Sequence, residues 1–341
     1  MPSTPHVEFS LRAGTGEIRL NRPEMLNALT LEMIEAIDGQ VTEWATDPKV
    51  TGILIAKAGT GEAFCAGVDQ RALYEALQAG DREYGARVYR RFYQLLYRIA
   101  TCKKPTLAVM DGITMGGGVA LGAHCKIRVG TRNTYLANAD CKIGYFPDGG
   151  AAFFYNKCPG EIGMFLALTG VALRARGLFH AGLLTHMVPE KQVHMISPLL
   201  INEIAVPPPV STLADIESHV NQVFGLGGVP EIKGVLAARS GEWAKGTAEQ
   251  LRPQSPTSLA LTYRHLRTAQ GKSLEEVLKA DYRLSQHLID GHDFREGIRA
   301  FVIDRDEKPA WQPAEQRDVT QAALDALFAP LDQGMEWSPA A

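Results

Sequence analysis

Three segments of the chain hold residues whose types and spacing suit chemistry at a carbonyl group. They are "AFCAGVD" (63–69), "GITMGGGVAL" (112–121) and "NADCKIGYFPDGG" (138–150). In the first, a predicted strand ends at small residues, which leaves the amides of Ala66 and Gly67 free of side-chain cover. In the second, the helix that follows the glycines directs unpaired N–H groups and the positive end of its dipole at whatever precedes it. Two such turns that face each other would form a two-donor site for an oxyanion.

Simpler interpretations exist for each segment. The glycine triad at 116–118 also fits a tight turn or a close helix-to-strand contact. A phosphate-binding loop is disfavoured, because the chain has neither GxGxxG nor GxxxxGK[ST]. Asp69 is better explained as the N-cap of the helix that follows it, and Asp148 could cap a helix that begins near Gly149.

Other reactive side chains give weaker signals. Cys65 lies beside the proposed donors, but no charged partner is adjacent in sequence, so we expect a buried filler rather than a nucleophile. The chain has no GxSxG elbow and no HExxH, and His180 with His186 does not have the spacing of a helical metal pair. No metal site is therefore expected.

The elements that must position these segments follow an α/β pattern. Short β-rich runs such as "GEIRLN" and "TGILIAKA" alternate with helical patterns. The clearest predicted helix follows Thr30 and ends near Asp47, with apolar residues at helical spacing at Leu31, Ile34, Ile37 and Val41. Two later units, from "LAVMDGI" and from "TYLANAD", each predict a strand, a glycine-bearing turn and then a helix.

A proline-rich segment, "VPPP" at 206–209, cannot continue a helix and predicts a linker. We therefore expect a core over residues 1–205 and a helical C-terminal lobe over residues 206–341. Within that lobe, "TSLALTYRHLRTAQ" and "SLEEVLKADYRLSQHLIDG" are typical of helices. Residues 318–341 carry few signals and are expected to fray.

Composition limits the classes of partner. The 341 residues are 45% hydrophobic and 21% charged, with a formal net charge of −3, which offers no basic field to a nucleic acid or an anionic membrane. Five cysteines without a CxxC pair, and no secretory pattern in residues 1–30, favour a reducing cytoplasm. The most apolar stretch, 105–125, is too interrupted for a membrane span. We expect small molecules or copies of the chain as partners.

In combination the segments resemble the enoyl-CoA hydratase/isomerase (crotonase) superfamily, in its 3-hydroxyisobutyryl-CoA hydrolase branch. The motifs "LNRPEMLNALTLEMI", "AFCAGVD", "GITMGGGVAL" and "IGYFPDGG" match in order and spacing, over nearly the whole chain. The tail segments "SPTSLALTYRHL" and "YRLSQHLIDGHDFREGIRAFVIDRDEKPAWQPA" resemble the hydrolase branch in particular. The resemblance implies an α/β fold, a crotonase-like spiral of ββα units with a helical C-terminal region.

The resemblance also implies a site for an acyl-CoA thioester, whose carbonyl oxygen is bound by the amides of Ala66 and Gly117. Hydratases of the superfamily place a glutamate two residues after the glycine triad, where this chain has Ala120. The hydrolase branch uses a glutamate in a Pro-Glu pair and an aspartate before the Gly-Gly, and the matching positions are Asp140 and Asp148. Substrate binding is expected to involve Cys65, Gly67, Asp69, Gly116, Phe92 and Phe146.

Three positions depart from the branch pattern. Asp140 is one methylene shorter than the expected glutamate, Phe92 stands where the branch often has another acid, and Glu24 stands where relatives commonly have a basic residue. The acyl pocket is accordingly expected to be more apolar, or to accept a different hydroxyacyl group.

The leading hypothesis is hydrolysis of a short, branched β-hydroxyacyl-CoA. Asp140 would serve as general base or as nucleophile through a mixed anhydride, and Asp148 would hold the β-hydroxyl. The alternatives are a hydratase or double-bond isomerase that uses Asp148 as its acid/base, and a non-catalytic acyl-CoA binder. CoA would be part of the substrate, with no separate cofactor, and the resemblance implies a homo-oligomer, a trimer or hexamer.

Overall fold

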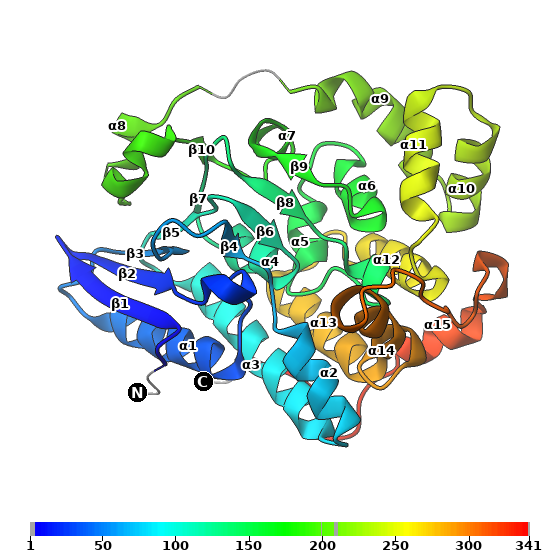
Figure 1. Cartoon of the computed structure of the whole chain (residues 1–341), viewed down its shortest axis with the longest axis horizontal. Coiled ribbons are helices and arrows are strands. Elements are labelled where there is room, and N and C mark those ends of the chain that lie inside the picture. Colours follow the sequence, from blue (N-terminus) through cyan, green and yellow to red (C-terminus); the bar gives the residue numbers. More distant parts are fainter. Residues whose placement is uncertain (1–3, 199, 208–210, 340–341) are drawn as a thin grey trace.

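Two β-sheets surrounded by helices make up the computed structural model, which describes residues 4–198, 200–207 and 211–339 (Figure 1). The strands are β1 Val7–Arg12, β2 Thr15–Leu20, β3 Gly52–Lys57, β4 Ala63–Cys65, β5 Thr106–Val109, β6 Ile113–Met115, β7 Ile127–Gly130, β8 Tyr135–Ala137, β9 Leu173–Arg174 and β10 His186–Met187.

The helices of the first two thirds of the chain are α1 Leu31–Thr46, α2 Gln70–Gln78, α3 Arg82–Thr101, α4 Gly117–Ala123, α5 Ala151–Tyr155, α6 Ile162–Thr169, α7 Ala175–His180, α8 Ile201–Ile204 and α9 Leu213–Phe224. The later helices are α10 Val229–Ala238, α11 Glu242–Leu251, α12 Pro256–Thr268, α13 Leu274–Leu288, α14 His292–Ile298 and α15 Gln321–Leu327. Short 3-10 turns are η1 Pro23–Met25, η2 Asp140–Ile143, η3 Glu190–Met195 and η5 Gln316–Asp318, and η4 Arg299–Ile303 is a π-helical turn.

The order of strands shows how the chain winds. One sheet has the order β1-β2-β3-β5-β7-β10 and the other has the order β4-β6-β8-β9. The pairs β3 and β4, β5 and β6, and β7 and β8 each give one strand to each sheet before the chain enters a helical segment. This alternation is the spiral of ββα units that the resemblance implies, and the fold class is confirmed.

Local sequence explains the best-formed elements. β3 is a continuous apolar run, buried along nearly its whole length, as expected for a strand with parallel neighbours on both sides. The hydroxyl of Thr30 accepts the amide of Met33 and caps α1, whose apolar face packs against α3. The helix predicted after Thr30 is thus confirmed.

The C-terminal helices pack directly on the elements that carry the motifs. α13 contacts α3 and α5, α12 contacts α5, α6 and η2, and α14 contacts η2 (Figure 1). The helical C-terminal region is confirmed, whereas the boundary between 205 and 206 stays a prediction. Part of the predicted "VPPP" linker, residues 208 and 209, lies outside the described residues.

The chain end does not fray over its described part. Residues 321–327 form α15, and the Trp337 side chain is 1% exposed. Its Nε1 donates to the carbonyl oxygen of Arg90 on α3 at 3.3 Å. The expectation of a frayed tail is wrong, because the side chain of Trp337 is buried against α3.

Candidate active site

The glycine triad forms the turn from β6 into α4, and each glycine is needed for a different reason. Gly116 has a φ of 48°, in the left-handed region. A Cβ on Gly118 would overlap the carbonyl oxygen of Cys65, so this glycine permits the close helix-to-strand contact. A Cβ on Gly117 would lie 3.0 Å from Cζ of Phe92 and 3.3 Å from the nitrogen of Val68. Bare backbone at Gly117 therefore faces another main-chain amide.

Two main-chain amides converge at this turn. Gly67 has a φ of 100°, and a Cβ built on it would lie 2.9 Å from the nitrogen of Gly117. Leu29 donates its amide to the carbonyl of Gly67 at 2.7 Å and accepts that of Asp69 at 3.0 Å, which turns the intervening N–H of Val68 toward Gly117. Neither the Val68 nor the Gly117 amide has a hydrogen-bond partner among the described residues.

The predicted donor Ala66 is wrong. Its amide donates to the carbonyl oxygen of Leu26 at 2.9 Å and is not free for a substrate oxygen. The free amide belongs to Val68, because the positive φ of Gly67 changes the direction of the chain between the two residues. Gly117, the other predicted donor, does present an unpaired amide.

Asp140 lies beside the triad. It is the first residue of η2 and 8% exposed, and its Oδ1 would lie 3.5 Å from a Cβ on Gly116. Its Oδ2 is buried and has no hydrogen-bond partner within the described part of the chain. Burial raises the pKa of Asp140 to about 7. The carboxyl group is thus poised to exchange a proton near neutral pH.

Asp148 occupies a second buried position, with different partners. Its Oδ2 accepts the hydroxyl of Tyr93 at 2.5 Å and that of Tyr145 at 3.3 Å. Burial, and next the charge of Asp140, raise the pKa of Asp148 well above its ordinary value, and the Tyr93 hydrogen bond partly opposes the shift. The N-cap of α5 is Gly150, without a side-chain bond, so the interpretation of Asp148 as a helix cap is wrong.

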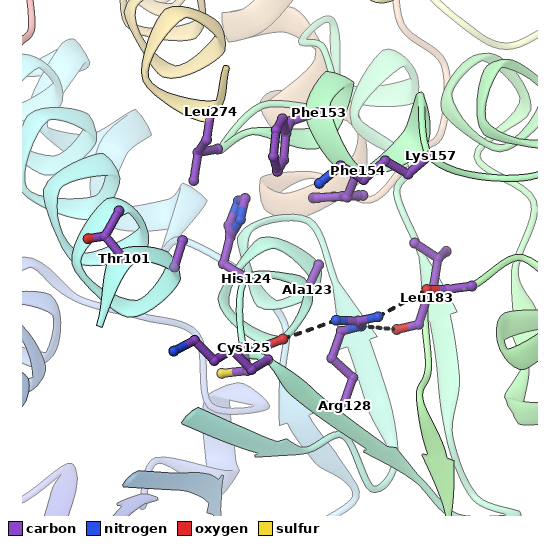
Figure 2. Close-up of a pocket in the computed structure, with 13 residues that line it drawn as sticks. Thr101, Ala123, His124, Cys125, Arg128, Phe153, Phe154, Lys157, Leu183 and Leu274 are labelled. Carbon is purple, nitrogen blue, oxygen red and sulfur yellow. Dashed lines mark hydrogen bonds between the residues drawn. The ribbon is translucent and has the colours of Figure 1, made fainter. Parts of the chain in front are cut away.

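The turn after Asp148 is held from behind by His124. Nε2 of His124 lies 2.7 Å from the carbonyl oxygen of Gly149. Burial lowers the pKa of His124 to about 4, so the ring is neutral at physiological pH and donates Nε2–H to that carbonyl. Figure 2 shows His124 in the wall of a cavity of about 490 Å³, which contains neither Asp140 nor Asp148. His124 therefore lines this cavity and also contacts the turn that follows Asp148.

A buried pair from the C-terminal helices holds the same turn. Oδ2 of Asp281, on α13, accepts the amide of Gly150 at 2.6 Å, and its Oδ1 lies 2.6 Å from Nε2 of His265 on α12. Both side chains are almost completely buried. Asp148 is therefore positioned by contacts that reach more than a hundred residues along the chain.

Comparison with known proteins places the chain in a family. The family model described as enoyl-CoA hydratase/isomerase matches residues 15–328. The 3-hydroxyisobutyryl-CoA hydrolases of Rattus norvegicus and Gallus gallus, both described as mitochondrial, are 38% and 40% identical, each over 96% of this chain and 90% of the relative. The chain belongs to the enoyl-CoA hydratase/isomerase family, in its 3-hydroxyisobutyryl-CoA hydrolase branch.

A solved structure of this family agrees with the fold. The crystal structure of a carnitinyl-CoA dehydratase from Mycobacterium thermoresistibile superposes with a TM-score of 0.92 at 32% identity, and the match covers 97% of this chain and 98% of that one. Family membership and fold are thus shown by independent comparisons.

Ala120 stands where hydratases of the family have a glutamate, and its surroundings in the structure bear on the reaction type. Ala120 is buried, and a Cβ built on Gly149 would lie 2.9 Å from its methyl carbon. The methyl group packs against the turn that carries Asp148 and offers no proton-transfer group there. Phe92 fills the neighbouring space with an apolar ring against Gly117.

The other residues predicted to bind substrate have mixed positions. Cys65 is fully buried, and burial raises its pKa to about 12, so its thiol is neutral. Asp69 caps α2 through the amide of Ala72 and pairs with Arg22 at 2.7 Å, as the simpler interpretation predicts. Phe146 packs against Tyr145 and His265, so its observed role is to support Tyr145.

Sequence analysis missed the polar residues around the two carboxyl groups. Tyr145 lies within a quoted segment, whereas Tyr93, His124, His265 and Asp281 lie outside the three segments, and none of the five carries a spacing signal of its own. Their common feature is burial of a polar group, which only the folded contacts reveal. No three His, Cys, Asp or Glu side chains come together as a metal site within 4–198, 200–207 and 211–339.

Proposed function

We propose that the chain hydrolyses the thioester of a short, branched β-hydroxyacyl-CoA, 3-hydroxyisobutyryl-CoA, to the free acid and CoA. The observation that carries the reaction type is the pair of unpartnered amides at Val68 and Gly117 beside the free Oδ2 of Asp140. The names of the relatives at 38% and 40% identity supply the substrate.

The two amides would bind the thioester oxygen. As a nucleophile attacks the carbonyl carbon, negative charge develops on this oxygen, and two fixed N–H donors stabilise it without reorganisation. The loss of one such donor typically lowers kcat by roughly 10²–10³. A side chain at Gly117 would enter the space that this oxygen needs.

Asp140 would supply the base or the nucleophile. With a pKa near 7, a substantial fraction of Asp140 is ionised at neutral pH and retains enough basicity to accept a proton from water. Alternatively its Oδ2 attacks the carbonyl carbon, the thiolate of CoA leaves, and water hydrolyses the resulting anhydride. Asp148 would orient the acyl group, since its Oδ2 is occupied by two tyrosines and its Oδ1 has no hydrogen bond among the described residues.

The proposal also covers cofactors, assembly and location. CoA is part of the substrate, and no separate cofactor or metal is needed. A homo-oligomer, a trimer or hexamer, and a cytoplasmic location stay predictions. Within the described ranges, the structure contains no helix with the length and apolarity of a membrane span.

Release of CoA thiol from 3-hydroxyisobutyryl-CoA tests the proposal directly. The wild-type chain is expected to release thiol, and Asp140→Asn to lose at least about 10²-fold in kcat, because the essential base or nucleophile is gone. Asp38→Asn, at a partly buried position of α1 paired with Arg98 on α3, is a matched control. Full thioesterase activity in Asp140→Asn would remove this assignment.

A hydratase or isomerase is the second candidate, favoured by the raised pKa of Asp148, since the shift favours the protonated form that can donate a proton. Loss of the enoyl absorbance of crotonyl-CoA measures this activity. Turnover of crotonyl-CoA without thiol release would support the second candidate, and calorimetric binding without either reaction would support an acyl-CoA binder.

A further inference from the structure

Two buried oxygen atoms near the carboxyl groups have no assigned role. They are the hydroxyl of Tyr89 on α3 and Oε1 of Gln70, the first residue of α2. Neither oxygen has a hydrogen-bond partner among the described residues. Buried polar atoms in proteins are nearly always paired, and an unpaired one lowers the free energy of unfolding by about 1–3 kcal/mol. Two unpaired oxygens on neighbouring helices are available to bind a polar ligand.

Tyr89 belongs to the aromatic cluster that surrounds Asp148. Its side chain is 1% exposed, and its ring stacks on Tyr145 with centroids 5.6 Å apart and lies 5.9 Å from the ring of Tyr93. These two tyrosines are the ones that donate to Asp148. The hydroxyl of Tyr89 is therefore next to the site but takes no part in the hydrogen bonds of Asp148.

The groups that act on the pKa of Tyr89 agree with this placement. Burial, followed by the charges of Asp148 and Asp140, raises the pKa of Tyr89, while the side chains of Tyr145 and Gln70 partly oppose the shift. The hydroxyl is therefore protonated. Gln70 follows the donor Val68 by two residues, so it lies on the segment that carries one of the two amide donors.

The two oxygens have complementary hydrogen-bonding ability. A tyrosine hydroxyl can donate, and the amide oxygen of glutamine can only accept. An alcohol group accepts and donates at one oxygen, so a single alcohol can satisfy both. An apolar acyl group would leave both unpaired.

We propose that Tyr89 and Gln70, in place of Asp148, bind the β-hydroxyl of the acyl group and make the site selective for hydroxylated over plain branched thioesters. The alcohol accepts the Tyr89 hydroxyl and donates to Oε1 of Gln70. This inference rests on the proposed function and adds two specificity residues to it. Phe92, in the same region, covers the apolar part of the acyl group.

The test compares 3-hydroxyisobutyryl-CoA with isobutyryl-CoA, which lacks the hydroxyl. Thiol release gives kcat/KM for each thioester with wild type, Tyr89→Phe and Gln70→Met. We expect each substitution to lower the ratio of the two kcat/KM values about tenfold, the usual effect of one lost hydrogen bond to a neutral partner. Tyr97→Phe, on the same helix but packed against Trp337, is the matched control and should leave the ratio unchanged.

Thermal unfolding separates binding from a structural role. Removal of an unpartnered buried hydroxyl should leave the unfolding midpoint of Tyr89→Phe equal to or above that of wild type. A lower midpoint with equal loss of both activities would overturn the proposal, as would an unchanged ratio in both variants.

Failure of the proposed hydrolase function can be distinguished from failure of the hydroxyl site. If wild type releases thiol from neither thioester, the hydrolase proposal falls, and calorimetry then decides the hydroxyl site. Tighter binding of the hydroxylated thioester by wild type, lost in Tyr89→Phe, would still support the site. Equal binding of both thioesters would overturn it.

Discussion

Asp140 and Asp148 are both buried aspartates, yet their surroundings give them different chemistry. Asp148 has two tyrosine hydroxyls on one oxygen, whereas Oδ2 of Asp140 has no partner among the described residues. Burial therefore acts on Asp140 with little to offset it and places its pKa at about 7. A group that titrates at neutral pH is suited to take up a proton during the reaction.

This pKa predicts the pH dependence of the reaction. The base is the ionised form, so kcat/KM for thiol release should rise as pH increases through about 7 and then level off. A pH–rate profile measured with substrate well below KM checks this. A profile that falls across the same range would show that Asp140 acts as an acid instead.

The same shift predicts the stability of Asp140→Asn. The folded pKa lies above the ordinary value of 3.8, so the folded state holds the proton more tightly, and stability decreases as pH rises from about 4 to about 7. Asp140→Asn removes this loss, and its free energy of unfolding at neutral pH should exceed that of wild type by up to about 4 kcal/mol, at 1.36 kcal/mol per pKa unit. Urea unfolding at about pH 7 and about pH 4 measures the difference, which should vanish at the lower pH.

The residue-level predictions from sequence were right where a motif fixes the backbone and wrong where one dihedral angle decides. Gly117 and Asp140 lie together beside the glycine turn, as the order of motifs suggested. The predicted donor, Ala66, lies two residues before the residue with the free amide, Val68. The reason is that the φ of 100° at Gly67 cannot be derived from the identity of its neighbours. Tyr93 was missed because its partner Asp148 is 55 residues away.

At the scale of elements, the turn between Asp148 and α5 is held by three other helices. His124, at the end of α4, contacts the carbonyl of Gly149, and Asp281 on α13 accepts the amide of Gly150 with support from His265 on α12. The two contacts act on the two ends of one peptide group, the one that joins Gly149 to Gly150. Motion of this turn, and with it of Asp148, requires both to break.

Asp281→Ala should weaken both the fold and the reaction. It leaves His265 and the Gly150 amide buried without their partner, which is expected to lower the free energy of unfolding by about 3–5 kcal/mol. We also expect kcat for thiol release to fall more than KM rises, since Asp148 loses its fixed position. Asp325→Ala removes an exposed partner of Arg264 and should change stability by less than about 1 kcal/mol. Equal free energies of unfolding in the two variants would contradict the role of Asp281 in holding the turn between Asp148 and α5.

At the scale of the whole molecule, the site belongs to both parts of the chain. Val68, Gly117 and Asp140 come from the strand-bearing part, and the support for Asp148 comes from helices after residue 206. One continuous apolar cluster includes buried residues from Val7 to Trp337. Periodicity predicted the helices one by one, but no local pattern encodes which distant surface each one covers.

The last described residues provide the clearest case. Trp337 is buried against α3, its indole donates to the carbonyl of Arg90, and the guanidinium of Arg90 in turn donates to the carbonyl of Met335 at 2.8 Å. This reciprocal contact joins the chain end to the helix that also carries Tyr89, Phe92 and Tyr93. The C-terminal segment therefore packs on the helix that supplies residues of the proposed acyl site.

Trp337→Ala tests this link. Truncation of a buried Trp typically lowers the free energy of unfolding by about 3–5 kcal/mol, and we expect that range here. Met335→Ala, at an exposed neighbouring position, should change it by less than about 0.5 kcal/mol. Urea unfolding of both variants makes the comparison, and a Trp337→Ala protein as stable as wild type would mean that the chain end only rests on α3. Because α3 positions Tyr89 and Phe92, the destabilised variant should also lose thiol-release activity at a lower temperature than wild type.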